Sequence, residues 1–264
     1  MTHARKRSRK RSKSSATGTE RLRILAIDIG GTGLKAAVID KDGRFVSERK
    51  RIPTPDPCPP KVMLKALDAL VADLPRFNRI SIGFPGYVKK GCIVTAPHFG
   101  TKRWKGFPLE AVLSKRLRAP AKLMNDADMQ GLAVISGKGL EFVITLGTGF
   151  GSAFFKDGEA LPHIEIAHIP VRHGMDYDAY VGDKARKKIG KAHWNRRVKR
   201  VIPIMETLLN YDRLLIGGGN AKRIAFRLPR NARIVSNDAG IEGGAALWHK
   251  LSGRSLVARR YGTA

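Results

Sequence analysis

A carboxylate and three glycines interrupt an apolar hairpin near the start of the chain. In RILAIDIGGTGLKAAVIDKDGRFV, residues 23–46, Asp28 precedes the turn Gly30-Gly31-Thr32-Gly33, and Lys35 follows it. A buried carboxylate is costly unless it is paired or bound to a cation, whereas glycine lets backbone N–H groups approach an anion closely. The residues therefore indicate either a site for a cation and a phosphate or a tight hairpin in which Asp28 only caps a turn.

The same pattern returns later in the chain. In EFVITLGTGFGSAFFKDGEAL, residues 141–161, two apolar strands flank the turn Gly147-Thr148-Gly149 and repeat the first hairpin at a shift of 116 residues. Two such hairpins suggest a duplicated fold with a cleft between its halves. Glycine loops that face each other there would clamp a phosphate chain from both sides, and chance similarity of two hairpins is the alternative.

A third glycine turn, Gly217-Gly218-Gly219, follows the apolar strand of RLLIGGGNAKR, residues 213–223, and is expected to open a helix. The chain has no GxxxxGK[ST] motif, so we do not expect a P-loop protein. Each glycine turn alone is a weak signal, but three of them at strand ends point more strongly to phosphate binding.

Strands and helices alternate along the chain. RISIGFPG, residues 79–86, predicts a strand that ends in a turn, FPLEAVLSKRL, residues 107–117, predicts a helix, and residues 121–136 predict a strand followed by a helix. An earlier helix is predicted from apolar residues spaced for one face, namely Met63, Leu67, Leu70, Val71 and Leu74. The alternation indicates α/β architecture.

The charge of the chain is strongly positive. Its 264 residues include 50 Lys/Arg and 22 Asp/Glu, which gives a net charge of +28. The first 20 residues hold seven Lys/Arg and one Glu and are predicted to be a disordered basic tail, so most of the excess charge lies on the remaining chain. Such a charge concentrates polyanions, either nucleic acid or polyphosphate, unless it only reflects a basic proteome.

The composition also predicts where the protein resides. No apolar run is long enough to span a bilayer, and polar residues follow the basic start where a secretory signal would be apolar. Two cysteines, Cys58 and Cys92, make neither a disulfide framework nor a zinc site. We therefore expect a cytoplasmic protein without a membrane partner.

Six motifs stand in the order found in the ROK sugar kinases, which the chain resembles over roughly residues 23–250: LAIDIGGTGLK, GFPGYV, NDAD, LGTGFGSA, LLIGGG and NDAGIEGGAAL. RIPTPDP, Trp104 after TAPHF, and HIEIAH are most similar to the polyphosphate-dependent members. The resemblance implies an α/β, two-domain hexokinase/actin-like (ribonuclease H-like) fold with the active site in the interdomain cleft. Residues 21–123 would form the first domain, completed by a C-terminal helix at about 240–252, and residues 124–239 the second.

The resemblance also implies which residues act on the sugar. Asp126 would be the general base that takes the proton of the sugar 6-hydroxyl, while Asn125, Glu165, His168 and Gly86 would bind the sugar. Without the family motifs, Asn125 and Asp126 would equally suit the N-cap and acidic first turn of a helix.

The donor and a metal ion would bind beside the base. By resemblance, Asp28 would lie near Mg²⁺, which prefers carboxylate oxygens and water. Phosphate or nucleotide would contact Gly30, Gly31, Thr32, Lys35, Gly147, Thr148, Gly149, Gly217, Gly218 and Gly219. For Lys35, a solvated position on the strand is the alternative.

The sequence departs from the family pattern beside the predicted sugar site. Glu165-Ile166-Ala167-His168 stands in place of the usual Glu-Leu-Gly-His, and His98 stands where asparagine is common. The hexose is therefore open. The zinc-binding cysteines of many family members are missing, so we expect no structural metal.

The segment KARKKIGKAHWNRRVKR, residues 184–200, holds nine Lys/Arg and no acid. Its charge density favours a track for polyphosphate, whereas a solvated helix face is the alternative. We thus predict a homodimeric, polyphosphate-dependent kinase of glucose or a related hexose, with ATP as a second donor. Two alternatives stay open: an ATP-only hexose or amino-sugar kinase of the family, and a sugar-responsive regulator or nucleic-acid-binding protein. No helix-turn-helix precedes Arg23, which counts against the regulator.

Overall fold

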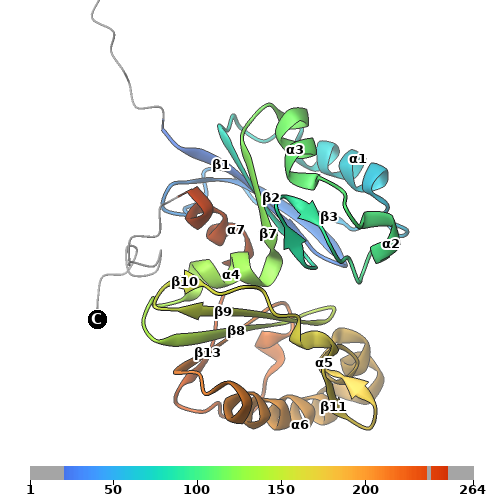
Figure 1. The fold of residues 1–264 in the computed structure, drawn as a ribbon, viewed down its shortest axis with the longest axis vertical. Helices are drawn as coiled ribbons and strands as arrows, with labels where there is room; N and C mark the ends of the chain where they lie inside the picture. The colour runs from blue at the N-terminus through green and yellow to red at the C-terminus, as the bar shows by residue number, and fades with distance from the viewer. Residues whose placement is uncertain (1–20, 237–238, 249–264) are drawn as a thin grey trace, which may run out of the picture.

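Two five-stranded sheets of the same topology form the framework of the computed structural model, which describes residues 21–236 and 239–248. The strand orders are β3-β2-β1-β4-β7 and β10-β9-β8-β13-β14. In each sheet the first three strands are antiparallel and the last two join in parallel. Each sheet belongs to one of the two lobes in Figure 1. The repeated hairpin thus corresponds to the same three-stranded unit, used once in each lobe.

The first sheet contains β1 (Arg23–Ile29), β2 (Gly33–Asp40), β3 (Lys50–Pro53), β4 (Arg79–Phe84) and β7 (Ala121–Asn125). The second contains β8 (Leu140–Leu146), β9 (Phe150–Lys156), β10 (Glu159–Ala160), β13 (Arg213–Gly217) and β14 (Ala232–Ile234). Two short ribbons pair β5 (Val88–Lys89) with β6 (Cys92–Ile93) and β11 (Pro170–Arg172) with β12 (Met175–Asp176). The helices are α1 (Pro60–Val71), α2 (Thr101–Trp104), α3 (Leu109–Leu117), α4 (Asp126–Val134), α5 (Tyr177–Val181), α6 (Asp183–Leu209) and α7 (Ala239–Glu242).

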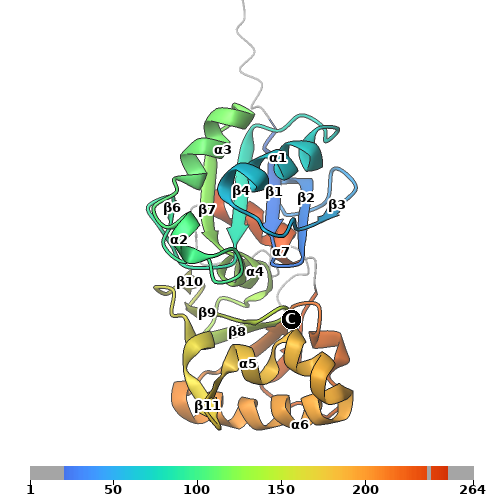
Figure 2. The same cartoon turned by 90° about the vertical axis from the view of Figure 1, so that its right-hand side faces the viewer.

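The outer faces of the two sheets are covered by helices whose positions follow from apolar spacing. Helix α1 buries the predicted residues Met63, Leu67, Leu70 and Val71, and it packs with α3 on the first sheet. Helices α5 and α6 cover the far face of the second sheet with a separate core that includes Trp194. Figure 2 shows these two helices at the end of the molecule farthest from α1 and α3.

Helix α4 lies between the two sheets and is buried along almost its whole length. Apart from Asp126, every residue of the helix is buried. One core joins side chains of α4 to β1 and β2 of the first sheet and to β8 and β9 of the second. Gly131 allows the close approach, because a Cβ atom at this position would overlap the ring of Phe155. The two lobes therefore share one continuous core around α4.

The end of the described chain packs back on the first sheet. The predicted C-terminal helix at about 240–252 is present as the four-residue α7, which continues directly as a 3₁₀ helix over Gly243–Trp248, while residues 249–252 lie outside the described part. Glycines lower helix propensity but allow contact, and Gly244 fits so closely that its carbonyl oxygen accepts from Ser81 Oγ at 2.6 Å. Close packing, not helix length, fastens this segment.

One helix prediction needs correction. The third glycine turn opens only a 3₁₀ helix over Ala221–Arg223, because the chain turns away again at Ile224. Helix α6 is interrupted at Gly190 (φ 77°, ψ 164°), a left-handed φ that glycine tolerates.

No helix among the described residues is long and apolar enough to cross a membrane. The predicted basic tail, residues 1–20, lies outside the described chain.

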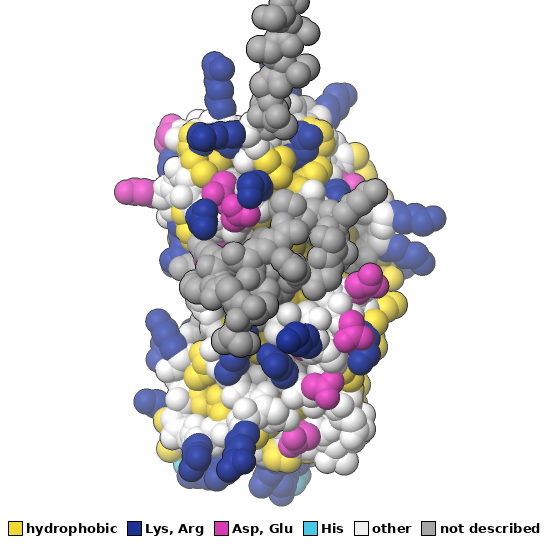
Figure 3. All heavy atoms as spheres, turned by 90° about the vertical axis from the view of Figure 1, so that its left-hand side faces the viewer, with side chains coloured by type: hydrophobic (Ala, Val, Ile, Leu, Met, Phe, Trp, Pro, Cys, Tyr) yellow, Lys and Arg dark blue, Asp and Glu magenta, His cyan; other side chains and the backbone are white. Residues whose placement is uncertain are grey.

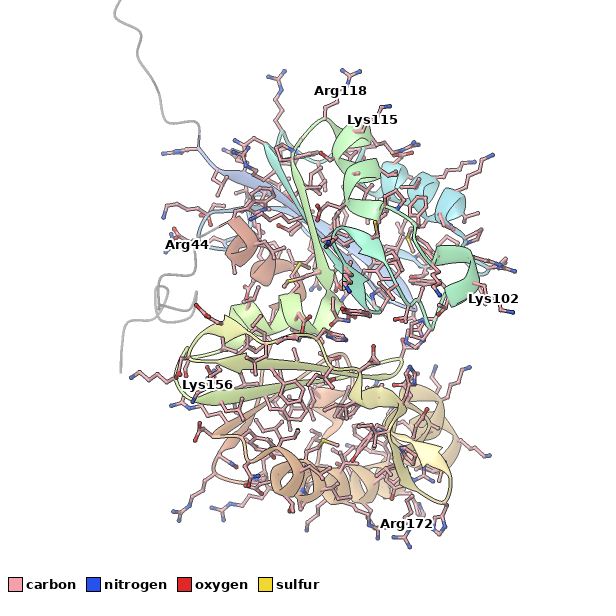
Figure 4. All side chains as sticks on the ribbon, viewed as in Figure 1. Arg44, Lys102, Lys115, Arg118, Lys156 and Arg172 are labelled. Atoms are coloured by element: carbon pink, nitrogen blue, oxygen red, sulfur yellow. The ribbon has the colours of Figure 1, made fainter. Side chains whose placement is uncertain are left out.

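The positive charge is spread over both lobes. Figure 3 shows one face on which Lys and Arg side chains are scattered over both lobes, with fewer Asp and Glu side chains among them. In Figure 4, Lys115 and Arg118 project from one end of the molecule, Arg172 from the other, and Lys102 and Lys156 from between. The folded body itself is therefore basic, as its composition predicted.

Candidate active site

A cleft of about 540 Å³ runs between the lobes and gathers the predicted site residues. Gly217 does not line the cleft, because it ends β13 inside the second lobe, where a Cβ atom would overlap the Gln130 amide. All the other predicted site residues line it: Asp28, Gly30, Gly31, Thr32, Lys35, Gly86, Asn125, Asp126, Gly147, Thr148, Gly149, Glu165, His168, Gly218 and Gly219.

Asp126 is the first residue of α4 and follows directly on β7. The Asn125 side chain caps the helix, since its Oδ1 accepts from the N–H groups of Ala127 at 2.8 Å and Asp128 at 3.2 Å. Its amide Nδ2 donates to the Gly86 carbonyl oxygen at 3.1 Å. Asn125 is therefore the N-cap of the helix, which was the alternative to a catalytic role for this pair. Asp126 does not cap the helix and lies half-buried on the wall of the cleft.

The surroundings of Asp126 favour its protonated form. Burial, together with the negative charges of Asp28, Glu165 and Asp128, raises the pKa of Asp126 to about 7, although the Ala127 N–H opposes the shift. A carboxylate with a pKa near the working pH is suited to accept a proton and release it again. The site therefore provides a candidate general base.

The two predicted glycine loops meet across the cleft. Each is closed by a similar short bond, from Gly30 N to Gly33 O at 3.0 Å and from Gly147 N to Gly149 O at 3.1 Å. A Cβ atom on Gly31 would lie 3.4 Å from Thr148 Cγ2 of the opposite lobe. A ligand between the lobes would therefore face backbone from both.

The predicted sugar ligands Glu165 and His168 lie on one side of the cleft. Glu165 directly precedes a 3₁₀ helix over Ile166–His168, His168 is the last residue of that helix, and Glu165 is partly exposed. His168 is more open, with 53 % of its side chain exposed and its Nδ1 3.6 Å from Asp176 Oδ2. His98 is also exposed and lies beside Gly31 at the rim of the cleft.

Asp183 also lines the cleft, beside the second glycine loop, and was not predicted from the sequence. Its N–H donates to the Gly147 carbonyl at 3.0 Å, and its carboxylate accepts from Arg186 at 2.7 Å, Lys187 at 2.8 Å and Asn220 at 3.2 Å. Burial alone would raise the pKa of Asp183, but these three side chains outweigh it and lower the pKa to about 2. Asn220 could have been predicted as a site residue, because it is a polar residue directly after the third glycine turn.

Arginines from both lobes also line the cleft. Arg51 comes from β3 of the first lobe and Arg223 from the 3₁₀ helix of the second, and neither makes an ion pair within the described chain. Of the predicted basic track, only Arg186 and Lys187 line the cleft. The rest of the 184–200 segment lies elsewhere on α6, so the density of charge in the sequence located the cationic wall only in part.

Two like-built lobes with glycine loops around a half-buried carboxylate define a protein of the hexokinase/actin-like fold. The structure of an inorganic polyphosphate/ATP-glucomannokinase from Arthrobacter sp. strain KM superposes with a TM-score of 0.78 and 33% identity, over 86% of this chain and 100% of that one. The profile of the ROK family matches residues 24–172, and the chain belongs to this family.

Two relatives show the range within that family. A polyphosphate glucokinase from Mycobacterium leprae (strain TN) is 29% identical over 248 residues, covering 88% of this chain and 76% of the relative. An N-acetylmannosamine kinase from Shigella flexneri is 34% identical over 143 residues, covering 52% and 49%. Like these kinases, the protein is a phosphotransferase with an alcohol acceptor.

Proposed function

We propose that the protein transfers the terminal phosphoryl group of inorganic polyphosphate to the 6-hydroxyl of glucose and also accepts ATP. The observation that carries this proposal is that a single cleft is lined by Asp126, by the two glycine loops that face each other, and by arginines from both lobes. The relatives named for polyphosphate use cover most of the chain, which supports the same choice.

The reaction needs one proton acceptor and close positioning of two substrates. As the sugar oxygen attacks the terminal phosphorus, Asp126 takes the hydroxyl proton and the bond from phosphorus to the bridging oxygen breaks, so that a shortened polyphosphate leaves. Phosphoryl transfer depends mainly on positioning and on neutralising charge. Asn125, Glu165 and His168 would hold the sugar hydroxyls, and backbone N–H groups of the glycine loops would hold the phosphates.

The donor preference is inferred from the cations of the cleft. Arg186 and Lys187 are already paired with Asp183, whereas Arg51 and Arg223 approach from opposite lobes without such partners among the described residues. An ATP triphosphate is short, and the glycine loops alone offer it many donors. Arginines on both walls suit a longer chain of phosphates.

The residues present fit Mg²⁺ as the metal ion. Asp28 supplies a carboxylate beside Asp126, and Mg²⁺ is commonly held by one or two carboxylates together with substrate phosphates and water. Within the described ranges, no group of three or more His, Cys, Asp or Glu side chains that could hold a metal ion occurs. Asp28 would hold the ion, whose chemistry is to neutralise the charge of the transferred phosphoryl group.

An amino-sugar kinase is the second candidate, because the Shigella flexneri relative matches about half of the chain. Acceptor assays separate the two: glucose, mannose and N-acetylmannosamine are offered with either long-chain polyphosphate or ATP as the sole donor. Glucose 6-phosphate formed from polyphosphate, and lost in Asp126→Asn, supports the proposal. Turnover only of the N-acetylated sugar, or only with ATP, contradicts it. Light scattering tests the expected homodimer in the same preparation.

A further inference from the structure

A buried histidine next to the sugar side of the cleft has no part in the mechanism above. His163 Nδ1 lies 3.2 Å from Asp128 Oδ2, and His163 Nε2 lies 3.5 Å from Glu165 Oε2. Only 7 % of the histidine side chain is exposed. His163 therefore forms a bridge between helix α4, which carries Asp126, and the loop that carries Glu165.

The bridge requires a charged ring. Burial raises the pKa of Asp128, and the bond from His163 opposes that shift. Ionised carboxylates only accept hydrogen bonds, so an imidazole that bonds to an ionised carboxylate on each side carries a proton on both nitrogens. Burial alone would lower the pKa of His163, but the bonds to Asp128 and Glu165 raise it to about 10. An imidazolium between two carboxylates makes charge-assisted bonds, which are stronger than neutral ones.

The ring is also held from the opposite lobe. Tyr87 stacks on His163 with centroids 6.0 Å apart and an interplanar angle of 13°. Tyr87 follows Gly86 directly, and its N–H donates to Thr95 Oγ1 at 2.8 Å. The plane of the imidazole is thus fixed by a residue next to the predicted sugar ligand Gly86.

The backbone of the same loop has its own anchor. Ser152 Oγ, on buried strand β9, donates to the Ile164 carbonyl oxygen at 2.9 Å. This bond fixes the main chain beside Glu165 but leaves the torsions of its side chain free. Only the bond to His163 restrains the Glu165 carboxylate within the described chain.

We infer that His163 is a positioning residue, which aims the Glu165 carboxylate at a sugar hydroxyl by tying it to Asp128 on the helix of the base. The inference rests on the proposed function, because it takes Glu165 as a sugar ligand. A carboxylate fixed before the sugar arrives loses less conformational freedom on binding. Sugar affinity and placement of the sugar relative to Asp126 then depend on one bridge.

His163→Phe is the informative variant, because it keeps a ring against Tyr87 and removes both N–H donors. We expect glucose to bind about tenfold more weakly by calorimetry, while the KM for the phosphoryl donor stays unchanged. The acid limb of the kcat profile should move to higher pH, since the negative charges near Asp126 lose their cation. His193→Gln, on the exposed face of α6, is the matched control and should leave all three readouts unchanged.

A double-mutant cycle with Glu165→Gln separates a positioning role from a general loss of structure. If His163 acts through Glu165, adding His163→Phe to Glu165→Gln should weaken glucose binding no further. Additive effects, or unchanged affinity in His163→Phe, would overturn the inference while leaving the proposed function intact. Should Glu165→Gln itself bind glucose normally, the sugar site of the proposed function is wrong. If His163→Phe does not fold, Asp128→Asn breaks the other half of the bridge and is measured instead.

Discussion

Lys35 Nζ lies 2.8 Å from Asp28 Oδ2, and the two residues are direct partners in the β1–β2 register. Both side chains are mostly buried, at 19 % and 13 % exposure. The pair explains how a core strand tolerates a charge, because each ion compensates the other. The Lys35 side chain is therefore not solvated, as one interpretation of the sequence held, and its ammonium group already has a partner besides any phosphate of the donor.

Asp28 and Lys35 should therefore affect the metal requirement in opposite directions. Asp28→Asn removes a carboxylate oxygen, and we expect the Mg²⁺ concentration for half-maximal activity to rise about tenfold or more, since each carboxylate ligand matters to so hydrated an ion. Lys35→Met removes a competing cation and should lower that concentration. Titration of activity with MgCl₂ at saturating sugar and donor is the measurement. Equal, parallel shifts in both variants would contradict Asp28 as the ligand.

Asp126→Asn should keep the fold and glucose binding but lose about 10²- to 10⁴-fold in kcat, because the amide accepts no proton. In the parent enzyme the pKa of about 7 predicts that kcat falls as the pH drops below neutrality and Asp126 becomes protonated. Steady-state kinetics from pH 5 to 9 check both statements. Activity within a few-fold of the parent would reject Asp126 as the base.

The same substitution should stabilise the protein at alkaline pH. The pKa of Asp126 is raised above the unfolded value of about 3.9, so the folded state keeps a proton that the unfolded chain has released. That contribution is fully present below about pH 4 and is lost as the pH rises through about 7. Asparagine does not ionise, and we expect Asp126→Asn to gain on the order of 4 kcal/mol over the parent at pH 8 and little at pH 4. Urea unfolding without Mg²⁺ at the two pH values measures the difference; a gain independent of pH would refute it.

Glu165→Gln and His168→Ala should both weaken glucose binding, by unequal amounts. An unsatisfied polar group costs about 1–3 kcal/mol when buried, and Glu165 is the less exposed of the two. We expect about a tenfold or larger loss for Glu165→Gln and a smaller one for His168→Ala. Calorimetric titration with glucose gives both values, and unchanged affinity in both variants would move the sugar site elsewhere.

The arginines of the cleft, not those farther along α6, should govern the use of polyphosphate. Arg51→Gln with Arg223→Gln should raise the KM for long-chain polyphosphate and reduce the slope of its salt dependence by about two, because fewer counterions are released. The ATP reaction should change less. The matched control is Lys188→Gln with Arg196→Gln, which removes the same charge from exposed positions outside the cleft.

If the Lys188/Arg196 variant weakens polyphosphate use and the Arg51/Arg223 variant does not, polyphosphate binds along α6 and not along the cleft arginines. Arg197 is unsuitable for either pair, because it donates to the Tyr180 carbonyl oxygen at 3.0 Å and its guanidinium carbon lies 4.6 Å from the centroid of the Tyr180 ring. Replacing it would test packing as well as charge.

Local patterns predicted much of this fold because the signals were short in range. Helix α1 and the strand–helix step at Asn125 follow from apolar spacing and an N-cap, which act within a few residues. The two hairpins followed from their own repetition. The glycine-rich end was harder to predict: after Glu242 the chain continues as a 3₁₀ helix, in which Gly243 lies against Met129 and Gly244 against Ser81.

The missed site residues depend on contacts across the chain. His163 opens the HIEIAH motif in the sequence, but only the fold brings it to Asp128, 35 residues earlier. Asp183 contacts Gly147 and Asn220, and these three residues come from three separate segments of the chain. Arg51 reads as one more charge of a basic chain until β3 places it on the cleft wall.

The core shared by both lobes determines how such a molecule can move. A rigid-body rotation displaces each atom in proportion to its distance from the axis, and an axis through the well-packed surroundings of α4 disturbs the fewest contacts. Asp126, at the tip of that helix, would then stand almost still, while the arginines of β3 and of the far lobe swing through a longer arc. Under the proposed function, opening would therefore change the contacts with the polyphosphate chain far more than the position of Asp126, and the chain would advance by one phosphate while the proton acceptor stays in place.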